Sequence, residues 1–120
     1  MIRFKDVQAY LDAIAKKNGH LGNSPHGAFW NTLSYDDFKT QPVPNVGVPI
    51  MDTANPLQSP FYLILITQDG FQGIPQMPIG GPFITDTNPD YQVTLADGTQ
   101  ITGKQIACNL ADWLSHGFPQ

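Results

Sequence analysis

The stretch TGKQIACNLADWLSHG, residues 102–117, has the pattern of a helix against which the rest of the chain can pack. Its large apolar residues recur every three or four positions, which is the spacing of one buried helix face. These residues are Ile106, Leu110, Trp113 and Leu114. Thr102, or Gly103 directly after it, can cap the start of a helix, and Gly117 supplies a stop. The stretch therefore predicts a C-terminal amphipathic helix.

The residues just before this helix have the alternating pattern of strands. Residues 91–95 and 99–102 flank Ala96-Asp97-Gly98, and Asp-Gly is a common hairpin turn. We expect a small β-hairpin that leads directly into the last helix.

A second amphipathic helix is predicted at the other end of the chain. Apolar residues between Phe4 and Lys17 follow the same three-and-four spacing, and Asn18-Gly19 provides a left-handed stop. We expect this helix to pack against the C-terminal helix. The side chains expected at that contact are Val7, Tyr10, Leu11 and Ile14 on the first helix and the four apolar residues named above on the last.

The segment after the first helix predicts loops and one short helix. Residues 20–31 are expected to form a structured loop anchored by Phe29-Trp30. Ser34 with Asp37 three residues later is typical of a helix start, and it predicts one to two helical turns. Residues 41–50 contain three prolines, so this segment must be extended or turning.

The central segment predicts another helix followed by an irregular loop. Ser59-Pro60 is typical of a helix start, which favours a helix over residues 61–67 that ends at Asp69-Gly70. A buried strand is the alternative, because the run is short and rich in residues that favour strands. Residues 73–82 are rich in proline and glycine and predict no regular element.

Composition limits the architecture and the function classes. A chain of 120 residues is suited to one domain, and 11 glycines with 11 prolines indicate many loops. The net charge is −4 and the six Lys and Arg residues are dispersed, which argues against a nucleic-acid surface. The sequence contains no apolar run near the roughly 18 residues that a membrane span needs.

The N-terminus and the single cysteine say little about compartment. The first residues lack the apolar stretch of a secretory signal, so we expect a cytoplasmic protein if Met1 is the native start and a periplasmic one if a signal peptide was removed. Cys108 is the only cysteine, so an internal disulfide is excluded. We expect Cys108 to be a small buried core residue.

Short motifs follow one another in a recognisable order. Residues 22–27 read Gly-Asn-Ser-Pro-His-Gly, residues 59–63 read Ser-Pro-Phe-Tyr-Leu, Met77-Pro78 lies in the later loop, and the last helix ends Trp-Leu-Ser-His-Gly. In this order the chain resembles the class I cytochrome c fold, with the hairpin as an insertion. The resemblance implies one mostly α, loop-rich, cytochrome-c-like domain over residues 1–120. It also implies that His26 and Met77 would be the two axial ligands of haem iron in electron transfer.

The chain departs from this family at the haem-attachment site. Gly22 and Pro25 stand where a c-type cytochrome carries two cysteines, and neither can form a thioether bond. Covalent haem is therefore excluded, whereas non-covalent haem held by His26 and Met77 remains open. Without haem, His26 would bond loop carbonyls and Met77 would fill the volume of the porphyrin. Aromatic residues expected to share that volume are Phe29, Trp30, Phe71 and Phe83.

Other kinds of chemistry have little support in the sequence. His20, His26 and His116 do not share the spacing of a zinc site, and the scattered aspartates do not form a catalytic pair. Phosphate-binding, dinucleotide-binding and nucleophile-elbow motifs are missing. We expect neither catalysis nor a resident metal; a small enzyme or metal-binding domain using His20 and His26 is a third hypothesis.

Two proline-rich segments are candidates for contact with a partner protein. Residues 41–50 and 74–83 combine proline with apolar side chains and could form an exposed apolar patch. The leading hypothesis is a haem-free cytochrome-c-like domain that acts as a structural or protein-interaction module. The alternative is an electron-transfer protein that binds haem non-covalently through His26 and Met77. The sequence carries no signal for oligomeric state.

Overall fold

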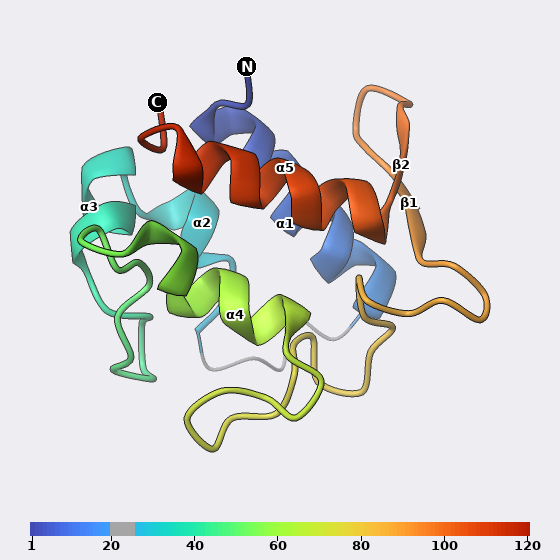
Figure 1. Cartoon of the computed structure of the whole chain (residues 1–120), viewed down its shortest axis with the longest axis horizontal. Coiled ribbons are helices and arrows are strands. Elements are labelled where there is room, and N and C mark those ends of the chain that lie inside the picture. Colours follow the sequence, from blue (N-terminus) through green and yellow to red (C-terminus); the bar gives the residue numbers. More distant parts are fainter. Residues whose placement is uncertain (20–25) are drawn as a thin grey trace.

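The computed structural model describes residues 1–19 and 26–120, and its helices surround one core that the C-terminal helix crosses (Figure 1). The radius of gyration is 13.2 Å, close to the value of about 13 Å expected for a compact domain of this size. In chain order the elements are α1 (Phe4–Asn18), α2 (Phe29–Thr32), α3 (Tyr35–Thr40), the 3-10 turn η2 (Pro56–Gln58), α4 (Pro60–Ile66), β1 (Gln92–Thr94), β2 (Gln100–Thr102) and α5 (Gly103–Ser115). The fold is mostly α, with a hairpin before the last helix, as the sequence predicts.

The two predicted amphipathic helices, α1 and α5, meet in the core. Their eight predicted contact residues are all buried in one hydrophobic cluster. The rings of Phe4 and Trp113 stack with their centroids 6.3 Å apart, and Asn109 Nδ2 donates to the Tyr10 hydroxyl over 3.0 Å. The prediction that the first and last helices contact each other is confirmed.

The ends of α1 and α5 also follow the predicted signals. Gly19 adopts a left-handed φ of 80° after α1, and its N–H donates to the Ala15 carbonyl. At the start of α5, Thr102 Oγ1 accepts from the Gln105 N–H, and Gln105 Oε1 accepts from the Thr102 N–H. This reciprocal pair satisfies two backbone donors that a helix start leaves unpaired.

The hairpin connects directly to α5. Strands β1 and β2 are antiparallel, with Val93 opposite Ile101, and these two side chains face the core. Gly103, the first residue of α5, lies against the Ile84 carbonyl: a Cβ built on it would stand 2.0 Å from that oxygen. The close approach requires glycine at this position.

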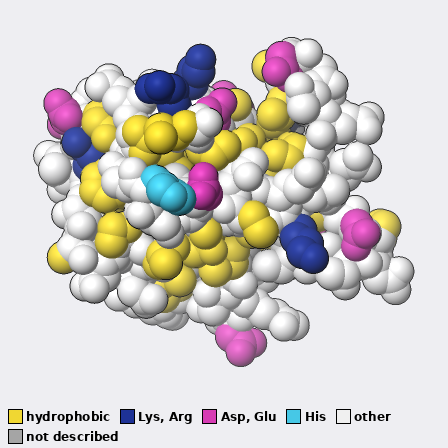
Figure 2. Space-filling model, turned by 45° about the horizontal axis from the view of Figure 1, so that its top comes forward, with side chains coloured by type: hydrophobic (Ala, Val, Ile, Leu, Met, Phe, Trp, Pro, Cys, Tyr) yellow, Lys and Arg dark blue, Asp and Glu magenta, His cyan; other side chains and the backbone are white. Residues whose placement is uncertain are grey.

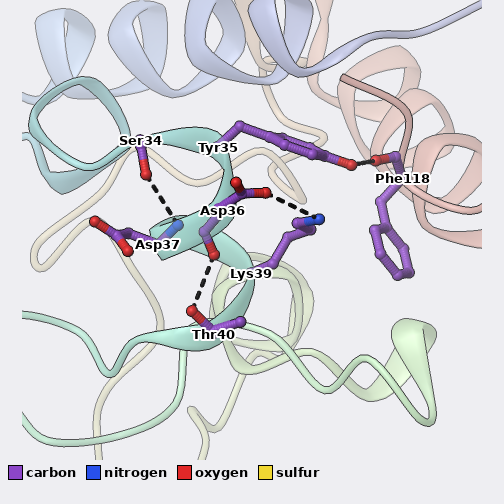
Figure 3. Close-up of polar contacts among 7 residues, drawn as sticks. All are labelled: Ser34, Tyr35, Asp36, Asp37, Lys39, Thr40 and Phe118. Atoms are coloured by element: carbon purple, nitrogen blue, oxygen red, sulfur yellow. Dashed lines mark hydrogen bonds and ion pairs between the residues drawn. The ribbon is translucent and has the colours of Figure 1, made fainter.

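Helix α3 begins at the predicted cap and contacts the C-terminal segment. Ser34 Oγ accepts from the Asp37 N–H over 3.1 Å, which confirms the predicted start. Figure 3 shows the Tyr35 hydroxyl donating to the Phe118 carbonyl and Lys39 paired with Asp36. The Tyr35 bond joins residues 83 positions apart, so α3 is fixed to the end of the chain.

α4 is a helix, as favoured over the strand alternative, and it begins as predicted, with Ser59 at the cap position and Pro60 as its first residue. The Ser59 hydroxyl does not cap the helix, because it accepts instead from the Asp52 N–H over 3.0 Å. The helix stops with Thr67 as its cap residue, before the predicted end at Asp69-Gly70. Gly70 closes the following turn, where its N–H donates to the Thr67 carbonyl.

Phe29 and Trp30 are buried, as expected, but the expectation that they lie in a loop is wrong, because they begin the short helix α2. Side chains of α1 hold this short helix: Asp12 Oδ1 accepts from Trp30 Nε1 over 2.7 Å, and Gln8 Nε2 donates to the Trp30 carbonyl over 2.8 Å. Four residues form a helix poorly on their own, so these bonds from outside the segment determine its conformation. Residues 20–25 of the expected loop lie outside the described residues.

Candidate functional site

His26 lies in the turn before α2 and is half-buried. Its Nδ1 is 2.6 Å from the Gly27 carbonyl oxygen. Because a carbonyl only accepts, Nδ1 carries the proton in this contact, and Nε2 is the unprotonated nitrogen of the neutral ring. The expectation that His26 bonds a loop carbonyl is confirmed. Gly22 and Pro25, where the resemblance would place the two attachment cysteines, lie outside the described residues, as does His20.

The His26 ring rests against a series of aromatic side chains that continues into the core. Its edge meets Phe29 at a centroid distance of 5.3 Å, and Phe29 stacks on Phe38 at 6.1 Å. Phe38 in turn meets Phe61 at 5.3 Å and Trp113 at 6.5 Å, and both of these rings are buried. The space behind His26 is therefore occupied by packed aromatic rings.

Met77 lies in the predicted irregular loop and contacts the core from another side. Its N–H donates to the Ile64 carbonyl over 2.9 Å, which fixes the loop to α4. The side chain is partly buried and packs against the hydrophobic cluster. Of the aromatic residues expected to share its volume, Phe29 and Trp30 are buried, whereas Phe71 and Phe83 are half-buried.

A hollow of about 640 Å³ lies beyond the end of α4. It is lined by Ile66 and Gln68 at that end, by Gln76, and by side chains of the segment 83–87; neither His26 nor Met77 lines it. The two candidate axial ligands are therefore not brought together at this hollow.

Gln76 forms the buried part of the wall of this hollow. Only 5% of its surface is exposed, and its Nε2 donates to the Leu65 carbonyl and to Thr85 Oγ1, both over 2.9 Å. These bonds fix which end of the amide is the nitrogen, because the Leu65 carbonyl requires a donor. Sequence reasoning missed this residue, since one glutamine between two prolines of a loop carries no recognisable pattern.

Cys108 is exposed, so the expectation that it is a buried core residue is wrong. It lies two positions after Ile106, roughly 200° around the helix from that buried side chain, and therefore on the outer face of α5. The helical spacing of the buried residues of α5 was sufficient to predict that Cys108 is exposed.

Within the part of the chain that the structure describes, no group of three His, Cys, Asp or Glu side chains could hold a metal ion. His116 is 3.1 Å from Asp112 Oδ1 on the exposed side of α5.

Each of the two proline-rich segments exposes a large apolar side chain. Val46 is 38% exposed in the first and Ile79 is 62% exposed in the second. Leu57, in η2, is 45% exposed. Figure 2 shows that hydrophobic side chains also gather across the middle of one face of the molecule, with most charged side chains nearer its edges. Apolar surface of this kind is typical of contact sites.

Comparison with protein-family models, with curated proteins and with solved structures gave no match. Among the described residues, no helix combines the length and the apolar character that crossing a membrane requires.

Proposed function

We propose that this chain is a haem-free, cytochrome-c-like domain that acts as a structural or protein-interaction module, with no catalysis of its own. One observation carries the proposal: the aromatic series Phe29–Phe38–Phe61 occupies the interior behind His26 with ring centroids 6.1 and 5.3 Å apart. Packed interiors leave few voids larger than a water molecule, so a porphyrin at this place would have to displace buried rings.

The interaction part of the proposal rests on the exposed apolar residues of the two proline-rich segments. Ile79 is more exposed than Val46, at 62% against 38%. Both segments are joined to α4 by backbone hydrogen bonds, from the Phe61 N–H to the Ile50 carbonyl and from the Met77 N–H to the Ile64 carbonyl. Apolar side chains presented on fixed loops need little ordering when a partner binds.

The alternative, non-covalent haem, is favoured by one feature. A histidine that ligates a metal commonly donates from its other ring nitrogen to a carbonyl, which orients the ligating nitrogen. His26 Nδ1 has such a contact with Gly27, and this would leave Nε2 to bind iron.

A haemin titration distinguishes the two functions. We expect the purified wild-type protein to be colourless and to develop no Soret band of bound haem. A band that forms in the wild type and in a His116→Ala control, but is lost in His26→Ala and in Met77→Ala, would replace the module with an electron carrier.

Affinity capture with the tagged full chain tests the interaction. We expect Ile79→Ser to reduce recovery of a bound protein several-fold, whereas Leu57→Ser, which changes an exposed apolar residue outside the two segments, leaves recovery unchanged. Equal recovery with all three chains would contradict a role for residues 74–83. Failure of the wild-type chain to retain any protein would contradict the interaction role itself.

A further inference from the structure

The hollow beyond α4 has hydrogen-bonding capacity that the fold does not use. Gln76 Nε2 makes both of the hydrogen bonds found for this side chain within the described residues, so Oε1 is left as an acceptor. Thr85 Oγ1 accepts from Gln76, which leaves its O–H as a donor. The hollow thus has an acceptor on a side chain that is fixed by two bonds and almost fully buried.

Asp86 adds a charged acceptor to the same wall. Its Oδ2 accepts from the Phe83 N–H over 2.9 Å, which sets the position of the carboxylate at the start of the turn. No described residue donates to Oδ1, which is therefore left for another donor. The ion pairs found in the described part of the chain lie elsewhere, between Lys39 and Asp36 and between His116 and Asp112.

The charge around the hollow favours a cation. Among the described residues that line it there is no Lys, Arg or His, and the chain as a whole has a net charge of −4. An anion would meet the Asp86 carboxylate without a compensating base. Phe83, half-buried in the same wall, offers an aromatic ring against which a cation can lie.

We propose that this hollow binds a guanidinium or ammonium group, which would donate to Gln76 Oε1 and Asp86 Oδ1. At about 640 Å³ the hollow is larger than such a group, so the cation would be one end of a larger ligand. That ligand is either a small amine-bearing molecule or an arginine or lysine side chain of a peptide. Because Asp86 is exposed, its charge contributes modestly, and binding of the isolated group is expected to be weak.

Chemical-shift titration of the ¹⁵N-labelled full chain with methylguanidinium tests the site. We expect saturable shifts at the amides of Gln76 and of residues 83–87, and no such shifts with urea, which has a similar planar shape but no charge. Asp86→Asn should weaken binding about two- to fivefold, the range for one exposed charge. Equal shifts with urea, or none at these residues with methylguanidinium, would overturn the proposal.

The matched control is Asp97→Asn. Asp97 is also an exposed turn aspartate that accepts a backbone N–H, from Thr99, but it does not line the hollow. Binding should be unchanged in this variant, and an equal loss in both variants would reduce the effect to net charge and overturn the site. Thr85→Val keeps the side-chain shape but removes the oxygen that accepts from Gln76 Nε2, so it should weaken binding by loosening the Gln76 amide. Full affinity in this variant would contradict the role of a fixed Gln76 amide in the site.

The source of the cation is settled by two further probes. Agmatine carries the guanidinium on a small molecule, and acetyl-Ala-Arg-Ala-amide carries it on a peptide. Tighter binding of agmatine supports a small-molecule ligand, and tighter binding of the peptide supports an arginine of a partner protein. If neither binds in competition with methylguanidinium, the hollow is not the binding site.

Discussion

The same substitution, Tyr to Phe, is expected to have opposite effects at two buried positions. Tyr91 is 3% exposed, and within the described residues its hydroxyl has no hydrogen-bond partner. Tyr10 is 6% exposed, and its hydroxyl accepts from Asn109 over 3.0 Å. An unpaired buried hydroxyl costs about 1–3 kcal/mol, whereas a satisfied one contributes about 1 kcal/mol. Tyr91→Phe should therefore raise the free energy of unfolding by about 1 kcal/mol, and Tyr10→Phe should lower it by about as much.

The pH dependence of stability gives a second signature at Tyr91. Burial, with a smaller contribution from Asp86, raises the pKa of Tyr91 to about 12. In the unfolded chain the pKa is about 10, so above that pH the unfolded state loses this proton first and stability falls as pH rises. The loss reaches about 1 kcal/mol at pH 11 and about 3 kcal/mol once pH exceeds the folded pKa. Tyr91→Phe lacks this contribution, so its advantage over the wild type should grow between pH 10 and 12.

Urea unfolding followed by tryptophan fluorescence measures both effects, because Trp30 and Trp113 are retained in each variant. In thermal unfolding at neutral pH, a change of 1 kcal/mol in the free energy of unfolding corresponds to a shift of about 4 °C in Tm for a domain of this size. If Tyr91→Phe destabilises the protein as much as Tyr10→Phe does, the Tyr91 hydroxyl has a partner in solution and the reasoning fails.

Two further substitutions test contacts that position the helices. Gly103→Ala should lower the free energy of unfolding by at least about 2 kcal/mol, because its Cβ would stand 2.0 Å from the Ile84 carbonyl oxygen. Gly98→Ala should cost only about 1 kcal/mol, because Gly98 has a φ of +89° but open space around it. Thermal unfolding compares the two variants, and equal costs would argue against the close contact at Gly103. Asp12→Ala should lower the free energy of unfolding by about 1–2 kcal/mol, because it leaves the Trp30 Nε1 donor unpaired. Asp12→Asn should cost less, because it keeps an acceptor. If urea unfolding shows no difference between the two variants, the Asp12–Trp30 hydrogen bond does not stabilise α2.

Local sequence signals predicted the elements whose ends and buried face are determined by residues within or directly next to the element. The spacing of apolar residues in α1 and α5 lies within each helix, and the Ser34 cap and the Asp97-Gly98 turn lie within a few residues of what they start or close. Helix α2 could not be predicted in this way, because the bonds that hold Trp30 come from Gln8 and Asp12 on another helix.

The candidate site was predicted only in part. His26 and Met77 came from the resemblance to class I cytochromes, and sequence order alone could not show that aromatic rings pack behind one while the other contacts the core through α4. The hollow is built from three separate segments, joined where Gln76 bonds Leu65 and Thr85, and such a meeting leaves no local pattern. Cys108 is a different case. The helical spacing of α5 was sufficient to predict that it lies on the outer face, and the expectation of burial did not use that spacing.

Thr102 belongs to two elements at once, and this links their formation. As the last residue of β2 it is paired with Gln92, and as the cap of α5 it bonds Gln105. The Gly103 N–H also donates back to the Tyr91 carbonyl over 2.9 Å. Forming the first turn is the costly step of helix formation, because several residues lose conformational entropy for one hydrogen bond. Closing the hairpin already orders Thr102 and Gly103, so less entropy remains to be lost when α5 begins. Residues 91–115 are thus a unit of short-range contacts that should open and close cooperatively, with amide exchange in the hairpin and in the first turn of α5 rising together.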